Sequence, residues 1–321
     1  MRLTSSKEEH VFEAIAADTA SSATVLVKRA AGELARAIEE IEADDPGSFW
    51  DALTDLASEL VWAKRDMAPF VNLASDVLAA AERGVLSGAP PDALKTAAVS
   101  AAAETLEFAD ADVEHLAREA ERALPPCTTA ATLSTSAAVR AALERIAQRT
   151  ERVVIAESRP ALEGVELASR LAGTGISVRL VSDAAFPAEL TDADVLLLGA
   201  DAVTEQSFVN KTGSYPAALA AREADVPLFV LAQKSKIIPE ALCRRPEPGD
   251  PAGLAPSRPE GVEVVNRLFE AVPLELVRAV ITEDGLLQPD DLTAVLRARP
   301  VSPALLQMLF PKRPGADVAA A

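Results

Sequence analysis

An aspartate, an amide and a lysine in the second half of the chain carry side chains suited to proton transfer and phosphate binding. Asp201 follows the apolar run Val195–Gly199, and Asn210 and Lys211 come just before a helical stretch that starts near Ser214. A carboxylate after a strand can act as a general acid or base, and a lysine beside the N–H groups of a helix start can bind phosphate. The pattern also fits a turn aspartate and a solvated lysine, so both interpretations stay open.

A second polar segment, Glu157-Ser158-Arg159-Pro160, follows another short apolar run. Its proline suits the first position of a helix, and the Arg159 guanidinium could make paired hydrogen bonds to a phosphate. Arg159 could instead form an ion pair with Glu157 or Glu163. The segment is therefore a second candidate for binding an anion.

Short apolar runs alternate with helical stretches from residue 153 onward, which predicts strands and helices in turn. Each run is almost entirely apolar, as expected of parallel strands that helices cover on both faces. We therefore expect the α/β fold class, with a Rossmann-like parallel sheet. Ligands bind beyond the carboxyl ends of the strands in such sheets. The residues in those positions are Glu157, Ser158, Arg159, Asp183, Asp201 and the segment 234–236, which ends in Lys236.

The first part of the chain has a different pattern. Apolar residues there recur at spacings of three and four, which is typical of helices that bury one face. Proline and glycine residues separate these stretches. With 321 residues, the chain is also longer than most single domains. We expect a helical N-terminal domain at residues 1–122 and a Rossmann-like domain at residues 123–321.

Composition argues against several classes of partner. Acidic residues outnumber basic ones by 49 to 31, and a net charge of −18 repels nucleic acid. No apolar stretch reaches the roughly 18–20 residues of a membrane span, and no signal peptide is evident. Cys127 and Cys243 do not make a disulfide framework and fit a reducing cytosol. We expect a cytoplasmic protein that binds neither nucleic acid nor membranes.

Several common catalytic and cofactor motifs are absent from the sequence. There is no glycine-rich nucleotide loop after a strand and no Cys/His cluster for zinc. Both histidines of the chain lie in helical stretches of its N-terminal half, which makes a Ser-His-Asp relay a poor explanation. We expect neither a metal nor another cofactor.

Taken together, the polar segments resemble the translation initiation factor 2B alpha/beta/delta family, which also includes isomerases of methylthioribose 1-phosphate and ribose 1,5-bisphosphate. The matching motifs are Glu157–Gly164, Gly199–Asp201 and Asn210–Tyr215, with weaker matches at Arg65–Pro69 and Phe269–Glu270. The resemblance implies a helical N-terminal domain and a Rossmann-like C-terminal domain. It also implies a homodimer or a larger even-numbered oligomer.

For the isomerases, the resemblance implies conversion of an aldose 1-phosphate into the 2-ketose phosphate by an aspartate and a cysteine. Asp201 matches the aspartate. The positions expected to bind phosphate or sugar hydroxyls are Arg159, Asn210, Lys211 and Lys236, and we add Glu157 to the substrate-binding residues. Such a site fits general acid–base chemistry with the phosphate held by cations.

The cysteine position departs from the family pattern. Aligning Thr132–Val139 with the family segment places Ser134 where the isomerases have cysteine, and Ser134 is our second catalytic candidate. A serine hydroxyl is a poor acid or base unless a neighbour activates it, and serine here is similar to the non-catalytic, regulatory members. An alternative alignment would bring Cys127 into the site.

Three functions are compatible with this resemblance, and we favour the enzyme because the aspartate and the phosphate-binding positions are all present. The first is an aldose–ketose isomerase for a sugar 1-phosphate. The alternative is a non-catalytic protein that binds a phosphorylated sugar or a nucleotide as a sensor or regulatory subunit. A third interpretation, a translation factor subunit that docks on a GTPase, rests on analogy at the level of the fold.

Overall fold

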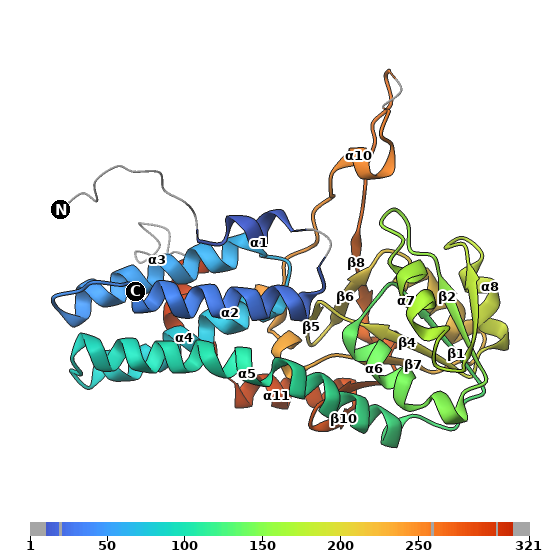
Figure 1. Cartoon of the computed structure of the whole chain (residues 1–321), viewed down its shortest axis with the longest axis horizontal. Helices are drawn as coiled ribbons and strands as arrows, with labels where there is room; N and C mark the ends of the chain where they lie inside the picture. Colours follow the sequence, from blue (N-terminus) through green and yellow to red (C-terminus); the bar gives the residue numbers. More distant parts are fainter. Residues whose placement is uncertain (1–10, 19–20, 258–259, 300, 311–321) are drawn as a thin grey trace, which may run out of the picture. The chain divides into compact units, whose positions relative to one another are not determined.

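The computed structural model describes residues 11–18, 21–257, 260–299 and 301–310. The chain forms two compact units (Figure 1). One comprises the described residues within 11–65, 69–108 and 299–310, and the other comprises those within 66–68 and 109–298. A single long helix, α5 (Pro91–Ala123), runs from the first unit into the second. The predicted domain boundary at residues 122/123 lies at the end of this helix and stays a prediction.

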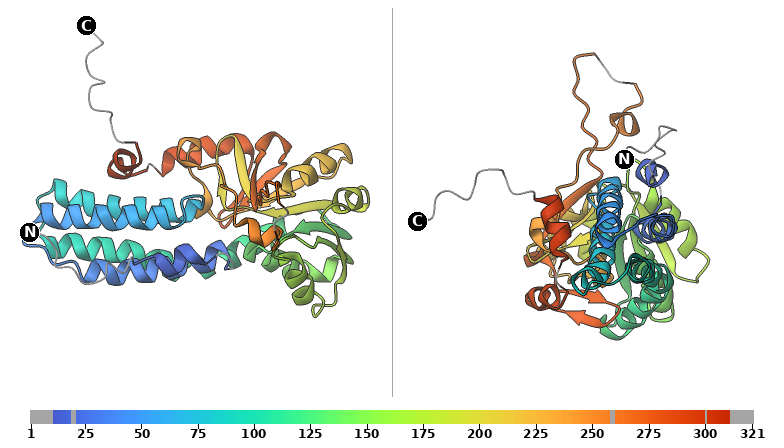
Figure 2. Two further views of the ribbon diagram at one scale, coloured as in Figure 1. Left: turned by 90° about the horizontal axis from the view of Figure 1, so that it is seen from above. Right: turned by 90° about the vertical axis from the view of Figure 1, so that its left-hand side faces the viewer.

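The first unit is helical, as predicted for this part of the chain. It contains α1 (Glu13–Ala17), α2 (Ala23–Glu39), α3 (Pro46–Ala63), most of α4 (Ala68–Leu86), the first half of α5 and α12 (Pro303–Leu309). Asp45 starts α3 by accepting hydrogen bonds from the backbone N–H groups of Gly47 and Ser48. Helices α2 to α5 run alongside one another (Figure 2), and their apolar faces form the core.

The second unit is built on a seven-stranded sheet with the strand order β10-β9-β7-β4-β1-β2-β3. All neighbouring strands are parallel except β9 and β10. The strands are β1 (Thr129–Leu133), β2 (Arg152–Ala156), β3 (Ser177–Val181), β4 (Val195–Gly199), β7 (Leu228–Leu231), β9 (Ala279–Thr282) and β10 (Gly285–Leu287). This arrangement confirms the predicted α/β fold class.

Helices and a second, smaller sheet accompany these strands. The helices are α6 (Ala137–Arg145), α7 (Glu163–Leu171), α8 (Phe186–Glu189), α9 (Ser214–Glu223), α10 (Pro251–Leu254) and α11 (Leu292–Ala298). The antiparallel second sheet contains β5 (Ala202–Val203), β6 (Ser207–Lys211) and β8 (Phe269–Pro273). Short 3₁₀ turns occupy residues 147–149, 190–192, 234–236, 240–242, 274–276 and 289–291.

Strand β4 shows why the parallel strands are almost entirely apolar. Val195 and Leu197 belong to the core cluster that contains residues of α6 and α7, whereas Leu196 and Leu198 belong to the cluster that contains residues of α9. Successive side chains of a strand point to opposite faces, so a sheet with a core on each side needs apolar residues at every position. The sheet is therefore buried on both faces at β4, whereas most residues of the edge strand β3 are exposed or only partly buried.

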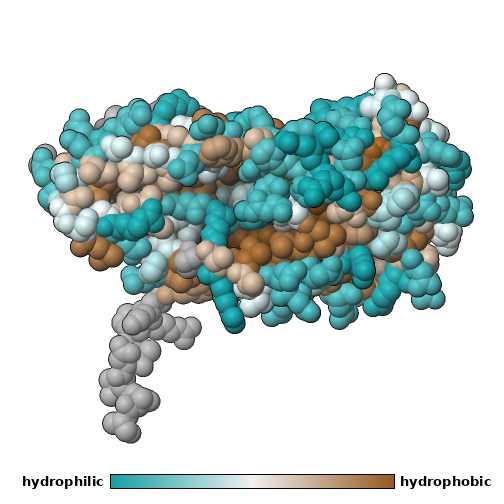
Figure 3. Space-filling view, turned by 90° about the horizontal axis from the view of Figure 1, so that it is seen from below, coloured by the Kyte–Doolittle hydropathy of each residue, from teal (hydrophilic) through white to brown (hydrophobic). Residues whose placement is uncertain are grey.

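Much of one face of the molecule is hydrophilic. Hydrophilic side chains cover much of the face shown in Figure 3, and apolar residues gather in patches between them. Within the described ranges, no helix has both the length and the apolar character needed to cross a membrane.

Helix α7 approaches β2 closely at Gly164. A Cβ atom at this position would lie 1.8 Å from the backbone oxygen of Ala156. We expect Gly164→Ala to lower the free energy of unfolding by about 1–3 kcal/mol, since overpacking here displaces backbone. Chemical denaturation measures the free energy of unfolding of the variant and of the wild type. Gly173→Ala is the matched control, because its Cβ would lie 3.8 Å from the nearest atom, the Arg170 oxygen. Equal denaturation midpoints for the two variants would contradict the expectation.

Candidate functional site

The predicted site residues that follow parallel strands lie at one edge of the large sheet. Ser134 comes directly after β1, Glu157 and Arg159 after β2, Asp201 after β4, and Lys236 in the turn after β7. The carboxyl ends of parallel strands meet at the same edge, which is where ligands bind in open α/β sheets. Their roles in binding or catalysis stay predictions.

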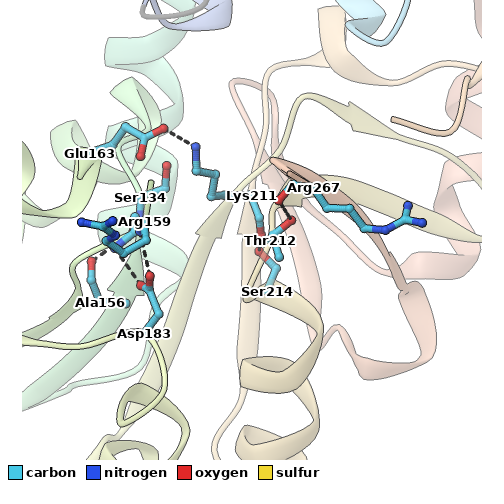
Figure 4. A network of polar contacts seen from close by, with 10 residues as sticks. Ser134, Ala156, Arg159, Glu163, Asp183, Lys211, Thr212, Ser214 and Arg267 are labelled. Carbon is cyan, nitrogen blue, oxygen red and sulfur yellow. Dashed lines mark hydrogen bonds and ion pairs between the residues drawn. The ribbon is translucent and has the colours of Figure 1, made fainter. Parts of the chain in front are cut away.

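The loops after β1, β2 and β3 are joined by hydrogen bonds (Figure 4). Ser134 and Ser158 have left-handed backbone, with φ of 61° and 64°. The Ser134 N–H donates to Ser158 Oγ at 2.7 Å, and the carboxylate of Asp183 accepts from the N–H groups of Ser158 and Arg159, both at 2.7 Å. These bonds offset the strain of the two serines and fix the backbone of Ser134.

Glu157 contributes to the same edge through its backbone. Its N–H donates to the oxygen of Val181 in β3 at 2.8 Å, and its oxygen accepts from the N–H of Gly164 in α7 at 3.2 Å. The Arg159 side chain is exposed, and within the described part of the chain its guanidinium has no ion-pair partner. Glu163, one of the two partners considered for Arg159, contacts a different cation.

That cation is Lys211, the last residue of β6. Its side chain is only 4% exposed, and its Nζ forms an ion pair with Oε1 of Glu163, the first residue of α7 (Figure 4). The ring of Phe269, which pairs with Lys211 across β6 and β8, lies 5.5 Å from Nζ. The ion pair joins residues that are 48 positions apart in the sequence.

The turn after Lys211 is held by its own side chains. Asn210 is buried, and its Nδ2 donates to Ser214 Oγ at 2.9 Å, while Ser214 Oγ donates to the Lys211 oxygen at 2.6 Å. At the start of α9, the N–H groups of Gly213 and Tyr215 both donate to Oε1 of Glu270 at 2.8 Å. A carboxylate of the chain therefore occupies the N–H groups considered for phosphate binding.

Asp201 and Lys236 form the electrostatic centre of the edge. The Asp201 N–H donates to the Val209 oxygen at 2.8 Å, and the Asp201 oxygen accepts from the N–H of Ala68 at 3.1 Å. Burial raises the pKa of Asp201, which the charges of Lys236 and Lys211 lower and that of Asp66 raises. Burial also lowers the pKa of Lys236, and the charge of Asp201 opposes this. Both shifts narrow the difference between the two pKa values, and perturbed pKa values of this kind are common in active sites.

Three acidic residues of the site were not among the predicted site residues. Glu163 and Glu270 occupy the donors considered for phosphate, and Asp66 lies within electrostatic range of Asp201. Asp66 belongs to the short segment 66–68, which lies with the sheet unit although its sequence neighbours are helical. In the sequence, Asp66 and Glu270 could have been found from the weak family matches at residues 65–69 and 269–270, which contain them.

Neither cysteine occupies the position of the family's catalytic cysteine, where this chain has Ser134. Cys127 precedes β1 at the amino end of the sheet, is 2% exposed, and has its Sγ 3.8 Å from Thr150 Oγ1. Cys127 therefore lies at the opposite end of β1 from Ser134. Burial raises the pKa of Cys243 to about 11, and the charges of Glu240 and Asp66 add to this, so its thiol is a poor nucleophile.

Comparison with known proteins supports the family resemblance. The sequence model of the Initiation factor 2 subunit family matches residues 19–289. The chain belongs to this family. A Pyrococcus horikoshii protein described as eIF-2B subunit 2-like is 29% identical over 271 residues, which cover 83% of this chain and 91% of that protein. A crystal structure of translation initiation factor eIF-2B from P. horikoshii OT3 is 26% identical, with a TM-score of 0.73, and covers 87% of this chain and 96% of that chain.

Isomerases match to a similar extent. Ribose 1,5-bisphosphate isomerase of Thermococcus kodakarensis is 26% identical over 288 residues, which cover 84% of this chain and 89% of that protein. Methylthioribose-1-phosphate isomerase of Maridesulfovibrio salexigens is 38% identical over 149 residues, or 43% of each chain. The family thus contains relatives of both kinds at comparable similarity.

The pKa of Asp201 can be followed by a carboxyl NMR titration. We expect its midpoint above the ordinary value of about 3.9, because burial disfavours the charged form. Lys236→Met removes a charge that lowers this pKa, so the midpoint should rise further. Because the folded protein binds this proton more tightly than the unfolded chain, the associated stability is lost as pH rises through the folded-state pKa.

Asp194 is the internal reference for this titration. Hydrogen bonds from the Thr129 N–H and from Thr128 outweigh burial and hold the pKa of Asp194 below its ordinary value. Its midpoint should not respond to Lys236→Met. An Asp201 midpoint at or below the ordinary value would contradict the analysis.

Proposed function

We propose that this chain binds a phosphorylated sugar at the carboxyl edge of the sheet and isomerises an aldose 1-phosphate to the 2-ketose phosphate. The observation that carries the proposal is the placement of Asp201 and Lys236 after the neighbouring parallel strands β4 and β7, where burial raises the pKa of Asp201 and lowers that of Lys236. Lys211 supplies a buried cation from the adjoining β6. Relatives named as ribose 1,5-bisphosphate and methylthioribose-1-phosphate isomerases add support.

Asp201 can act first as an acid and then as a base. In its protonated form it gives a proton to the ring oxygen of the sugar as the bond between this oxygen and C1 breaks. The hydrogen on C2 then moves with its electron pair to C1, and the hydroxyl on C2 returns its proton to the Asp201 carboxylate. The product carries a carbonyl at C2, and Asp201 is restored. Lys236 stabilises the intervening carboxylate.

The division of roles between Asp201 and Lys211 is testable. Asp201→Asn should reduce turnover on the order of 10²–10⁴-fold while ligand affinity stays largely intact, because only the proton carrier is lost. Lys211→Ala should weaken affinity itself. Proton and phosphorus NMR with ribose 1,5-bisphosphate and with methylthioribose 1-phosphate measures turnover, and calorimetry measures affinity. Equal loss of both properties in both variants would contradict this division.

A non-catalytic sensor or regulatory subunit is the second candidate, because Ser134 stands where the family's isomerases have cysteine. On this alternative the same edge binds a phosphorylated sugar or a nucleotide without converting it. The eIF-2B-like relatives are as similar to the chain as the isomerases are.

Restoring the thiol separates the two candidates. We expect the wild type to convert the sugar and Ser134→Cys to raise the rate, because a thiol is a far stronger acid than a hydroxyl and can relay the proton between the C2 hydroxyl and Asp201. Ser134→Ala is the matched control for the loss of the hydroxyl. An inert wild type that becomes active as Ser134→Cys would favour the sensor instead.

The remaining expectations are part of the same proposal. We propose a cytoplasmic homodimer or larger even-numbered assembly whose partner is a small phosphorylated ligand, with no metal or other cofactor. A role in translation rests on the family description and on the names of relatives. Pull-down from native lysate that recovers no translation factor would count against that role.

A further inference from the structure

Lys211 is a cation that needs a negative partner. Its side chain is almost fully removed from water, and it lies at the end of β6, where pairing with β8 fixes its backbone. The ring of Phe269 faces Nζ but carries no net charge. Removing an ammonium group from water is unfavourable unless an opposite charge accompanies it.

Glu163 supplies that charge from the start of α7. Its backbone position is set by Gly164, whose close approach to Ala156 leaves no room for a side chain. The Glu163 side chain is 21% exposed, so it reaches from the solvent boundary toward the buried Lys211. Only the side chain has to rotate for the carboxylate to leave.

The ion pair leaves one polar atom unsatisfied. Oε1 of Glu163 contacts Lys211, but Oε2 is buried without a hydrogen-bond partner among the described residues. An unmade hydrogen bond on a buried carboxylate costs free energy. Moving Glu163 toward solvent would satisfy that oxygen, provided that another anion takes its place beside Lys211.

Two other carboxylates of this unit, those of Asp183 and Glu270, are held differently. Asp183 accepts from two backbone N–H groups, and Oε1 of Glu270 accepts from two more. Displacing either would leave backbone donors without partners. Among the described residues, the Glu163 carboxylate contacts only the Lys211 side chain, so a ligand can take its place without leaving a backbone donor unpaired.

We propose that Glu163 is a built-in competitor for the phosphate of the ligand at Lys211. A phosphate oxygen offers Lys211 the same kind of contact as the carboxylate does, so ligand binding requires Glu163 to leave. Glu163 thereby sets the affinity of the site and selects against weakly held anions. The inference rests on the proposed function in one respect, namely that the ligand is phosphorylated.

The test compares affinities for inorganic phosphate and ribose 1,5-bisphosphate by calorimetry and phosphorus NMR. Glu163→Gln and Glu163→Ala should each bind both probes more tightly than the wild type, by about tenfold or more, because the competing charge is gone. The alanine variant shows that the gain does not come from a new amide hydrogen bond. Glu166→Gln is the matched control, since Glu166 lies on the same helix and pairs with Arg170 at the surface.

A double variant keeps the test valid if single changes at the buried cation prevent folding. Glu163→Gln combined with Lys211→Met removes both charges together and should lose the gain in affinity, while circular dichroism and thermal unfolding check the fold. Equal or weaker binding by both Glu163 variants would overturn the inference. A gain in affinity of the same size in the double variant would also overturn the inference.

The outcomes separate this inference from the proposed isomerase. If the wild type turns over its sugar but the Glu163 variants bind no more tightly, only the competitor is rejected. If no sugar is converted but the Glu163 variants bind phosphate more tightly, the isomerase is rejected and the competitor stands. Absence of phosphate binding in every variant rejects both.

Discussion

The close approach of α7 to β2 determines much of what the sheet edge can do. Because Gly164 leaves no space between the helix and the Ala156 oxygen, the first residue of α7 is held at the end of β2. That residue is Glu163, and its carboxylate reaches Lys211 on the second sheet. A backbone contact that admits no side chain therefore fixes the position of a charge.

Charge balance is the second constraint on this edge. Lys211 and Lys236 are both buried. Glu163 forms an ion pair with Lys211, and the charge of Asp201 acts electrostatically on Lys236. Breaking either pair would leave an uncompensated charge away from water. A ligand that enters this edge must therefore either take the place of a carboxylate near one of the lysines or exchange a proton with one of these groups.

Local sequence was sufficient to predict several parallel strands of the large sheet and the edge at which the residues after them lie, but not β1, β9, β10 or the second sheet. The apolar runs predicted strands buried on both faces, and the residues that follow them, such as Asp201, do lie at one edge. The partners of those residues were not predictable in this way. Glu270 accepts from the start of α9 across 57 positions of sequence, and Glu163 contacts Lys211 across 48. Such contacts depend on the packing of whole elements, which periodicity does not encode.

The hydrogen bond from Ala68 to Asp201 means that the sheet unit is not one continuous stretch of chain. Residues 66–68 belong to it, although 40 further residues, 69–108, lie in the helical unit before the chain returns. A fragment that begins at residue 109 would keep every strand of both sheets yet lose the donor to the Asp201 oxygen and the charge of Asp66. Fragment boundaries chosen from the sheet alone would therefore cut away part of the surroundings of Asp201.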